Sequence, residues 1–220
     1  MYLSRFRLSR SPQIAALDAL LDPAEKGRKH DAHHRLIWTA FADDPDAKRD
    51  FLWRKEGNGS FLVQSMRRPE TSPFFDSFDI REHAPDLRAG DRLGFLLRAN
   101  ATRDLRGERR RRVDVVMNLL HDVPKDQRAT TRMDLAQEAA ADWLAGQGMR
   151  AGFSVDRVEA QDYRTVSLPR QRRGGAPHFG ILDLTGLITV TEPDAFTHQL
   201  AQGFGRAKGF GCGLMLIRRA

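Results

Sequence analysis

Three histidines lie close together in the segment KHDAHHR, and they are the side chains of this chain best suited to chemistry. His30, His33 and His34 have the i, i+3 and i+4 spacing that places residues on one face of a helix. Imidazole takes and gives a proton near neutral pH, so one interpretation is acid–base work. A second is ligation of zinc or another transition metal. A third is a polar helix start whose histidines face water. The spacing leaves all three open.

The glycine-rich segment 203–214 is the second candidate site. It holds five glycines, with Arg206 and Lys208 between them. Glycines let backbone amides approach an anion closely, and neighbouring cations reinforce such a site. The spacing fits neither GxGxxG nor GxxxxGK, so we do not expect ATP binding. A flexible turn explains the segment equally well.

Positive charge is concentrated along the chain. Lys and Arg number 36 against 29 Asp and Glu, which gives a formal net charge of +7. The excess lies in residues 2–10, 103–112, 164–173 and 205–219. Such clustering predicts a basic surface for nucleic acid, because phosphate contacts require cations gathered on one face. The alternative is a set of solvated loops.

The composition is that of a soluble globular protein. The chain has 220 residues, of which 40% are hydrophobic and 30% charged, enough for one large domain or two domains of about 100 residues each. Its one cysteine, Cys212, excludes an internal disulfide and a cysteine-based zinc site. No run approaches 18 uncharged apolar residues, and the first residues alternate charge with apolarity. We therefore expect a cytoplasmic protein without a membrane partner.

The first half of the chain predicts a sheet covered by helices. Residues 2–8 alternate as a half-exposed strand does, and short helices are expected at 14–21 and 31–41. The strand-like runs 51–56 and 60–66 are separated by Gly57, Asn58 and Gly59, residue types that close a hairpin. A further strand is expected at 92–99.

The second half predicts a helix, three strands, a helix and a final strand. The helix opens at Thr130 or Thr131 and runs to about Gln147. The remaining elements are strands at 153–160, 163–168 and 178–190, a helix at 193–202 and a strand at 213–217. This order is similar to the later part of a ferredoxin-like unit. The expected fold is α+β with two tandem ferredoxin-like (RRM-like) domains, residues 1–125 and 126–220.

An ordered set of short motifs resembles the type I-E CRISPR-associated endoribonuclease family, CasE. The motifs are the opening MYLS, HRLIW at 34–38, RDFLWR at 49–54, LVQS at 62–65, LRAN at 97–100 and GCGL at 211–214. The resemblance implies two ferredoxin-like domains and metal-independent cleavage of precursor CRISPR RNA at repeat hairpins. It also implies retention of the product with the other Cascade subunits, and no cofactor.

The resemblance assigns roles to individual residues. His34 matches the family's catalytic histidine and Arg35 its basic neighbour. The family commonly has a tyrosine three positions before that histidine, where this chain has Asp31. We expect Asp31 to cap the helix, the alternatives being that it raises the pKa of His34 or orients its ring.

The expected RNA-binding residues lie outside the histidine segment, apart from Arg35. Residues 163–173 resemble the basic hairpin that the family sets against the RNA stem; the alternative is a disordered surface loop. An A-form stem exposes its bases poorly, so shape and phosphate contacts should dominate recognition. The residues expected to bind RNA are Arg35, Arg164, Arg170, Arg172, Arg173, Arg206 and Lys208.

RNA carries its own nucleophile, the 2′-hydroxyl, so cleavage requires no metal if side chains move the protons and offset phosphate charge. His34 suits either proton step. The other functions that the sequence allows are a hairpin-binding subunit that no longer cuts and a histidine metalloprotein.

Overall fold

The computed structural model describes residues 1–42, 46–57, 59–105, 111–168 and 178–220. Their contacts form two compact units. The first unit contains Met1–Ala84 and, from much later in the chain, Lys208–Gly211. The second contains Pro85–Val166, Phe179–Ala207 and Cys212–Ala220. Each unit has a four-stranded sheet of its own.

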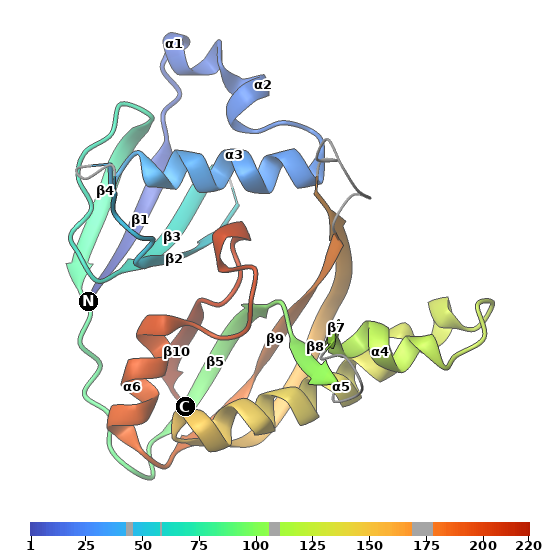
Figure 1. Ribbon diagram of the computed structural model, residues 1–220. Helices are drawn as coiled ribbons and strands as arrows, with labels where there is room; N and C mark the ends of the chain where they lie inside the picture. The colour runs from blue at the N-terminus through green and yellow to red at the C-terminus, as the bar shows by residue number, and fades with distance from the viewer. Residues whose placement is uncertain (43–45, 58, 106–110, 169–177) are drawn as a thin grey trace. The chain divides into compact units, whose positions relative to one another are not determined.

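The sheet of the first unit has the strand order β2-β3-β1-β4, with every neighbouring pair antiparallel. This is the strand order of a ferredoxin-like sheet. Helix α3 (Lys26–Trp38) lies across one face of the sheet (Figure 1), after the short helices α1 (Pro12–Ala15) and α2 (Asp18–Leu21). The strands are β1 (Tyr2–Leu8), β2 (Phe51–Lys55), β3 (Ser60–Ser65) and β4 (Phe75–Glu82).

Aromatic side chains fill the core between this sheet and α3. Phe6 lies opposite Phe61 in the register of β1 and β3, and its ring centroid is 5.1 Å from that of Phe75. Leu36 and Ile37 present the apolar face of α3 to the same core. Each fully buried side chain of this kind contributes about 1.5–3 kcal/mol. The second helix of a ferredoxin-like unit is missing here, because residues 66–74 run from β3 to β4 without forming one.

The second unit is a complete ferredoxin-like repeat. Its sheet has the order β10-β5-β9-β8, and helices α5 and α6 cover one face (Figure 1). In chain order the elements read strand, helix, strand, strand, helix, strand. They are β5 (Arg92–Ala99), α5 (Arg128–Ala151), β8 (Phe153–Ser167), β9 (His178–Val190), α6 (Pro193–Gln202) and β10 (Met215–Arg219).

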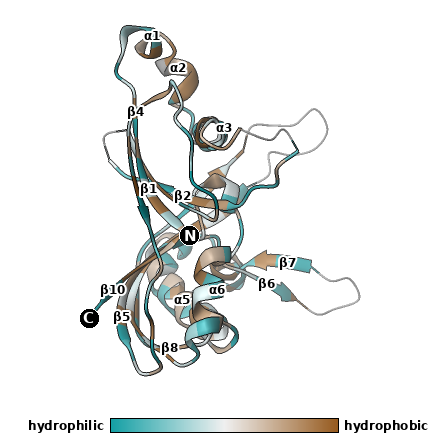
Figure 2. Cartoon of the chain, turned by 90° about the vertical axis from the view of Figure 1, so that its left-hand side faces the viewer, coloured by the Kyte–Doolittle hydropathy of each residue, from teal (hydrophilic) through white to brown (hydrophobic). Residues whose placement is uncertain are grey.

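A two-stranded hairpin and a short helix are inserted between β5 and α5. The strands β6 (Thr102–Leu105) and β7 (Arg111–Asp114) pair antiparallel and lead directly into α4 (Val115–His121). Figure 2 shows hydrophilic residues on both strands. Arg112 of β7 donates hydrogen bonds to Asp104 of β6 at 2.8 and 3.2 Å. Part of the arginine-rich segment expected at 103–112 therefore forms strands, and residues 106–110 lie outside the described chain.

The structure confirms the two-unit α+β fold, but it divides the chain at a different place. Strand β5 was expected in the first domain, 1–125. It pairs instead with β9, from Arg92 opposite Thr189 onward, and with β10 on its other side. Strand β5 is therefore the first strand of the second unit, and the division falls between Ala84 and Pro85.

Helix boundaries were also misplaced. Helix α3 begins at Lys26, five residues earlier than expected, so the prediction that Asp31 caps it is wrong. Helix α5 continues through Gly148 to Ala151 and ends at Gly152, which has a left-handed φ of 75°. A Cβ at Gly148 would lie 2.4 Å from the carbonyl oxygen of Phe153. Gly148 therefore lies inside the helix and lets the first residue of β8 pass close to it.

Two further differences separate the expected and observed strands. The expected pair 153–160 and 163–168 is one long strand, β8, and β4 was not expected at all. Strand β4 is exposed at most positions, so its sequence lacks the apolar alternation of a typical strand. No helix within the described ranges is long and apolar enough to cross a membrane.

Candidate active site

His34 lies on α3, one turn before its C-terminal end, and its ring is half-buried between three elements of the first unit. The ring centroid is 6.3 Å from that of Trp38 on the same helix and 6.0 Å from that of Phe51 on β2. The short 3₁₀ helix η1 (Lys208–Phe210) lies against α3 and β2. A Cβ at Gly209 would be 3.5 Å from Cε1 of His34, an ordinary van der Waals distance, so the chain at this position lies directly beside the ring.

A hydrogen bond from an indole fixes the protonation pattern of the His34 ring. Nε1 of Trp38 donates to Nε2 of His34 at 3.2 Å. The indole N–H is only a donor, so Nε2 must be the unprotonated nitrogen. The neutral ring then carries its proton on Nδ1, which is buried and has no hydrogen-bond partner among the described residues.

The surroundings keep His34 uncharged at neutral pH. Burial lowers the pKa of His34, and the guanidinium groups of Arg49 and Arg35 lower it further. The carboxylate of Asp31 opposes them without reversing the direction. Arg49 is itself fixed, because its Nη1 donates to the carbonyl oxygen of Phe51 at 2.5 Å. The result is a neutral imidazole beside positive charge, an arrangement suited to a proton acceptor near an anion.

His33 does not join His34 in a shared site. The His33 side chain is only 3% exposed, and its Nε2 donates to Oδ1 of Asp22 at 2.8 Å. The interpretation that all three histidines face water is therefore wrong for His33. Within the described ranges, no group of three or more His, Cys, Asp and Glu side chains is arranged to hold a metal ion.

Arg35 lies on the exposed side of α3. Its side chain is 79% exposed, and its Nε is 3.1 Å from Oδ2 of Asp31, an i, i+4 ion pair. Asp31 thus contacts Arg35 instead of the helix N-terminus. An exposed pair of this kind contributes less than about 1 kcal/mol to stability, so Arg35 remains free to exchange its carboxylate for a phosphate.

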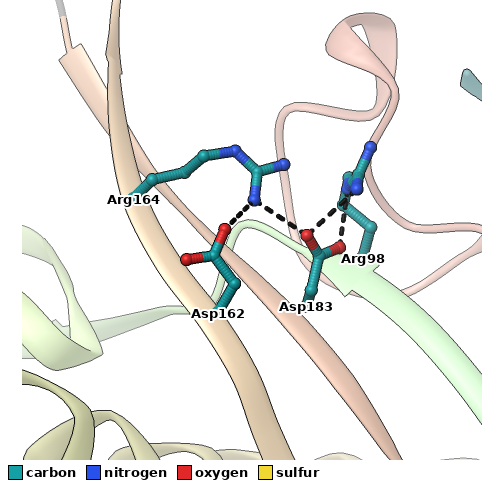
Figure 3. Close-up of polar contacts among 4 residues, drawn as sticks. All are labelled: Arg98, Asp162, Arg164 and Asp183. Carbon is teal, nitrogen blue, oxygen red and sulfur yellow. Dashed lines mark hydrogen bonds and ion pairs between the residues drawn. The ribbon is translucent and has the colours of Figure 1, made fainter.

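Arg164 belongs to an ion-pair network on the second sheet (Figure 3). Its Nη1 contacts carboxylate oxygens of both Asp162 and Asp183. Asp183 also accepts two hydrogen bonds from Arg98, at 2.6 and 3.0 Å. Two guanidinium groups and two carboxylates cancel, so this predicted RNA-binding residue has its charge balanced within the protein.

The remaining predicted contacts are distributed over the glycine-rich segment and the basic hairpin. Arg206 is exposed in the second unit, and its backbone N–H donates to the carbonyl oxygen of Asn100 at 3.1 Å. Lys208 begins η1 in the first unit, beside α3. Arg170, Arg172 and Arg173 lie outside the described residues.

Sequence reasoning did not assign Trp38, Arg49 or Gly209 to the site. The i, i+4 spacing of His34 and Trp38 was visible in the sequence and was sufficient to predict their contact. No local signal pointed to Arg49, which precedes β2 and approaches His34 only through the fold. Gly209 lies in the glycine-rich segment that the sequence offered as a second candidate site, but no local signal linked it to His34, which is 175 positions earlier in the chain.

These observations define an α+β protein with two ferredoxin-like units and a neutral, half-buried imidazole at a site in the first of them. A family model described as "CRISPR associated protein" matches residues 1–219. The chain therefore belongs to the family of CRISPR-associated proteins. The resemblance expected from the sequence motifs is confirmed.

One protein of known sequence and two solved structures show the extent of the similarity. The chain is 28% identical over 193 residues to the Cascade subunit CasE of Escherichia coli K12, covering 84% of this chain and 89% of that protein. The structure of the CRISPR endoribonuclease Cse3 bound to a 19-nucleotide RNA aligns with a TM-score of 0.74 and 20% identity, covering 99% and 100% of the two chains. Thermus thermophilus Cse3, bound to an RNA representing a pre-cleavage complex, aligns with a TM-score of 0.72 and 20% identity, covering 99% and 98%.

Proposed function

We propose that this protein is an endoribonuclease that cuts precursor CRISPR RNA at its repeat hairpins without a metal ion and remains with the product as a Cascade subunit. Its family membership supports this function, as do the CasE and Cse3 names of the proteins it resembles. The observation that carries the proposal is the His34 ring, neutral and with an unprotonated Nε2, beside Arg49 and Arg35.

The proposed reaction uses the RNA's own 2′-hydroxyl. His34 takes the proton of this hydroxyl on Nε2 while the 2′-oxygen forms a bond to the adjacent phosphorus. The bond from phosphorus to the 5′-oxygen of the next nucleotide breaks, that oxygen leaves as a hydroxyl after taking a proton from water, and protonated His34 returns its proton to the solvent. The products are a 2′,3′-cyclic phosphate and a 5′-hydroxyl, and no metal or oxidant is consumed.

The indole of Trp38 has a specific part in this mechanism. It donates to the nitrogen that must accept the proton. A substrate hydroxyl is also a donor, so it can take the place of the indole at Nε2 without requiring the ring to turn or change tautomer. Before RNA binds, Trp38 thus keeps Nε2 of His34 unprotonated and able to accept a hydrogen bond.

RNA binding is proposed to rest on phosphate contacts from arginines and a lysine. Arg35 and Arg206 have exposed side chains, and Lys208 lies beside α3. Arg164 stays in the proposal as a weaker contact because its charge is shared with Asp162 and Asp183. Arg170, Arg172 and Arg173 are proposed from the family resemblance alone.

A second candidate function is a hairpin-binding subunit that does not cut. One observation favours it: Asp31 occupies the position where the family commonly has a tyrosine, and its carboxylate is paired with Arg35. A carboxylate at neutral pH cannot donate a proton or a hydrogen bond as a tyrosine hydroxyl does.

The His34→Ala variant separates these functions. Wild-type protein and variant are incubated with a CRISPR repeat hairpin of the same genome in excess chelator, and cleavage and hairpin affinity are both measured. We expect cleavage by the wild type and a loss of at least a thousandfold in the variant, with affinity within threefold. Equal cleavage by both would exclude His34 as the base. No cleavage by the wild type, with tight binding, would favour the binding subunit, and cleavage that chelator abolishes would favour a metalloenzyme.

A further inference from the structure

A cluster of charged groups lies behind the candidate site and takes no part in the proposed proton transfer. Asp22, in the turn between α2 and α3, contacts three nitrogen groups through one carboxylate. Its Oδ1 is 3.1 Å from Nζ of Lys29, 2.8 Å from Nε2 of His33 and 3.0 Å from Nζ of Lys55. We refer to these four residues as the Asp22 cluster.

We propose that Asp22 is a positioning residue for His34: by tying α3 to β2 through His33 and Lys55, its carboxylate fixes the rotation of α3 that holds the His34 ring against Phe51. This inference rests on the proposed function, because it names a residue on which that function depends.

The rotation of α3 about its axis sets the positions of His33 and His34 together. His33 and His34 are consecutive, so their side chains leave the helix about 100° apart. The His33 ring points into the core, with its centroid 5.0 Å from that of Phe61. The His34 ring lies beside Trp38 and Gly209 instead. Any rotation of α3 that releases His33 from Asp22 must therefore also move His34.

Strand β2 contacts α3 through two of its side chains. Phe51 and Lys55 are four residues apart on this strand, so both side chains lie on the same face of the sheet. Phe51 contacts the His34 ring, and Lys55 donates to both oxygens of Asp22 at 3.0 and 3.1 Å. Helix and strand are thus linked at two points along β2, by an aromatic contact at one end and by the Asp22 cluster at the other.

The charges within the Asp22 cluster depend on burial and on the contacts between its members. Burial would raise the pKa of Asp22, but hydrogen bonds from Lys55, Lys29 and His33 lower it to about 2. Burial, and then the Lys55 ammonium, lower the pKa of His33 to about 4 against the attraction of Asp22. At neutral pH the cluster therefore contains a carboxylate, two ammonium groups and a neutral, donating imidazole. Replacing the carboxylate with an amide removes the charge that pairs with Lys55 and leaves a single acceptor oxygen for the buried His33 N–H and the Lys55 ammonium, which favours a rearrangement of α3.

Two substitutions at Asp22 and a matched control test the proposal in the full-length protein. Asp22→Asn keeps the size of the side chain and removes its charge, and Asp22→Glu keeps the charge. The control is Glu56→Gln, which removes a carboxylate next to Lys55 in sequence that forms an ion pair with Nε of Arg5 at 3.2 Å. The measurements are the single-turnover cleavage rate at saturating protein, the affinity for a hairpin with a 2′-deoxy cut site, and the ¹⁵N chemical shifts of His34.

We expect Asp22→Asn to slow cleavage at least tenfold while affinity stays within twofold. The two His34 nitrogen shifts should move toward each other, because the fixed tautomer is lost. Asp22→Glu should recover the rate to within threefold of wild type, and Glu56→Gln should leave rate and shifts unchanged. A purely structural role would lower the thermal midpoint without altering His34 shifts in the folded protein.

The outcomes separate this inference from the proposed function. If wild-type protein cuts the hairpin and folded Asp22→Asn cuts equally fast with unchanged shifts, the positioning role is overturned and the proposed function stands. If wild-type protein does not cut, the proposed function fails, and the His34 shifts alone decide whether Asp22 orients the ring. Should Asp22→Asn not fold, Lys55→Met breaks the link to β2 and keeps the bond between Asp22 and His33; a rate and shifts equal to wild type would then overturn the proposal.

Discussion

A single hydrogen bond between Trp38 and His34 sets the chemical state of the candidate site. The bond is available only to a ring with an unprotonated Nε2, so it stabilises the neutral imidazole. Burial and the nearby Arg49 guanidinium act in the same direction. A base must be unprotonated before it acts, and these contacts supply that state at neutral pH.

Trp38→Phe should therefore raise the pKa of His34. The phenyl ring keeps the packing against Phe51 but cannot donate to Nε2, so the neutral form loses about 1 kcal/mol of stabilisation, equivalent to about 0.7 pH unit. If His34 is a base, the single-turnover rate rises with pH through this pKa and the rising limb moves to higher pH in the variant. NMR titration of the His34 ring together with the pH–rate profile measures both effects. A pKa that stays constant or falls would show that the indole does not control the protonation of the ring.

At the scale of elements, α3 is held to its sheet by a buried histidine whose protonation is unfavourable. The His33 side chain is stable in the core only while it is neutral, because burial and Lys55 lower the pKa of His33 to about 4. The unfolded chain returns His33 to a pKa near 6.5. Between these two values the unfolded state binds the extra proton, so the folded first unit loses stability as pH falls.

The expected loss between pH 6.5 and pH 4 is on the order of 2–3 kcal/mol. Asp22, with its pKa lowered to about 2, adds a further loss only below about pH 3.8. His33→Leu should remove most of the first loss. Urea unfolding at pH 7 and pH 4.5 tests this, followed by the fluorescence of Trp38 and Trp53 in a Trp143→Phe background. An equal acid destabilisation with leucine at position 33 would assign the effect to other groups.

At the scale of the whole molecule, a net charge of +7 on 220 residues favours a polyanionic partner. The structure shows that not every arginine contributes equally. The guanidinium of Arg164 is balanced by two carboxylates, whereas Arg206 is exposed and forms no ion pair with any described residue. Total charge therefore overestimates the number of phosphate contacts.

Hairpin affinity should weaken as salt increases, because each phosphate contact releases counterions. Arg206→Ala should reduce the slope of log Kd against log salt concentration by about one. Arg157→Ala is the matched control, because this exposed arginine is paired with Glu159 at 2.7 Å. The measurement is a salt series of binding isotherms with a hairpin that cannot be cut. Equal slopes for wild type and Arg206→Ala would remove Arg206 from the RNA interface.

The sequence predicted the strands and the helix that combine a clear apolar pattern with strong turn residues. Residues 2–8, 92–99, 178–190 and 193–202 form elements with the expected bounds. The exposed strand β4 and the start of α3 were missed because their local patterns are weak. The sequence analysis assigned β5 to the first domain because strands paired across more than 80 residues carry no local sequence signal of that pairing.

Within the site, the family resemblance singled out His34, and its environment came from the fold. Spacing on the helix brings Trp38 to the ring, but only tertiary structure brings Arg49, Phe51 and Gly209 there. His33 shows what helical spacing could not predict. Its ring is buried in the core, where it forms a hydrogen bond with Asp22, eleven residues earlier in the chain.

The central claim is that the RNA's 2′-oxygen attacks its own backbone after His34 removes the proton. It is tested most directly with a repeat hairpin that carries a single 2′-deoxy nucleotide at the cut site, compared with the all-ribose hairpin in excess chelator. We expect the ribose hairpin to give a 2′,3′-cyclic phosphate and a 5′-hydroxyl, and the 2′-deoxy hairpin to stay intact while binding equally well. Cleavage of the 2′-deoxy hairpin at the same position and rate would contradict the mechanism.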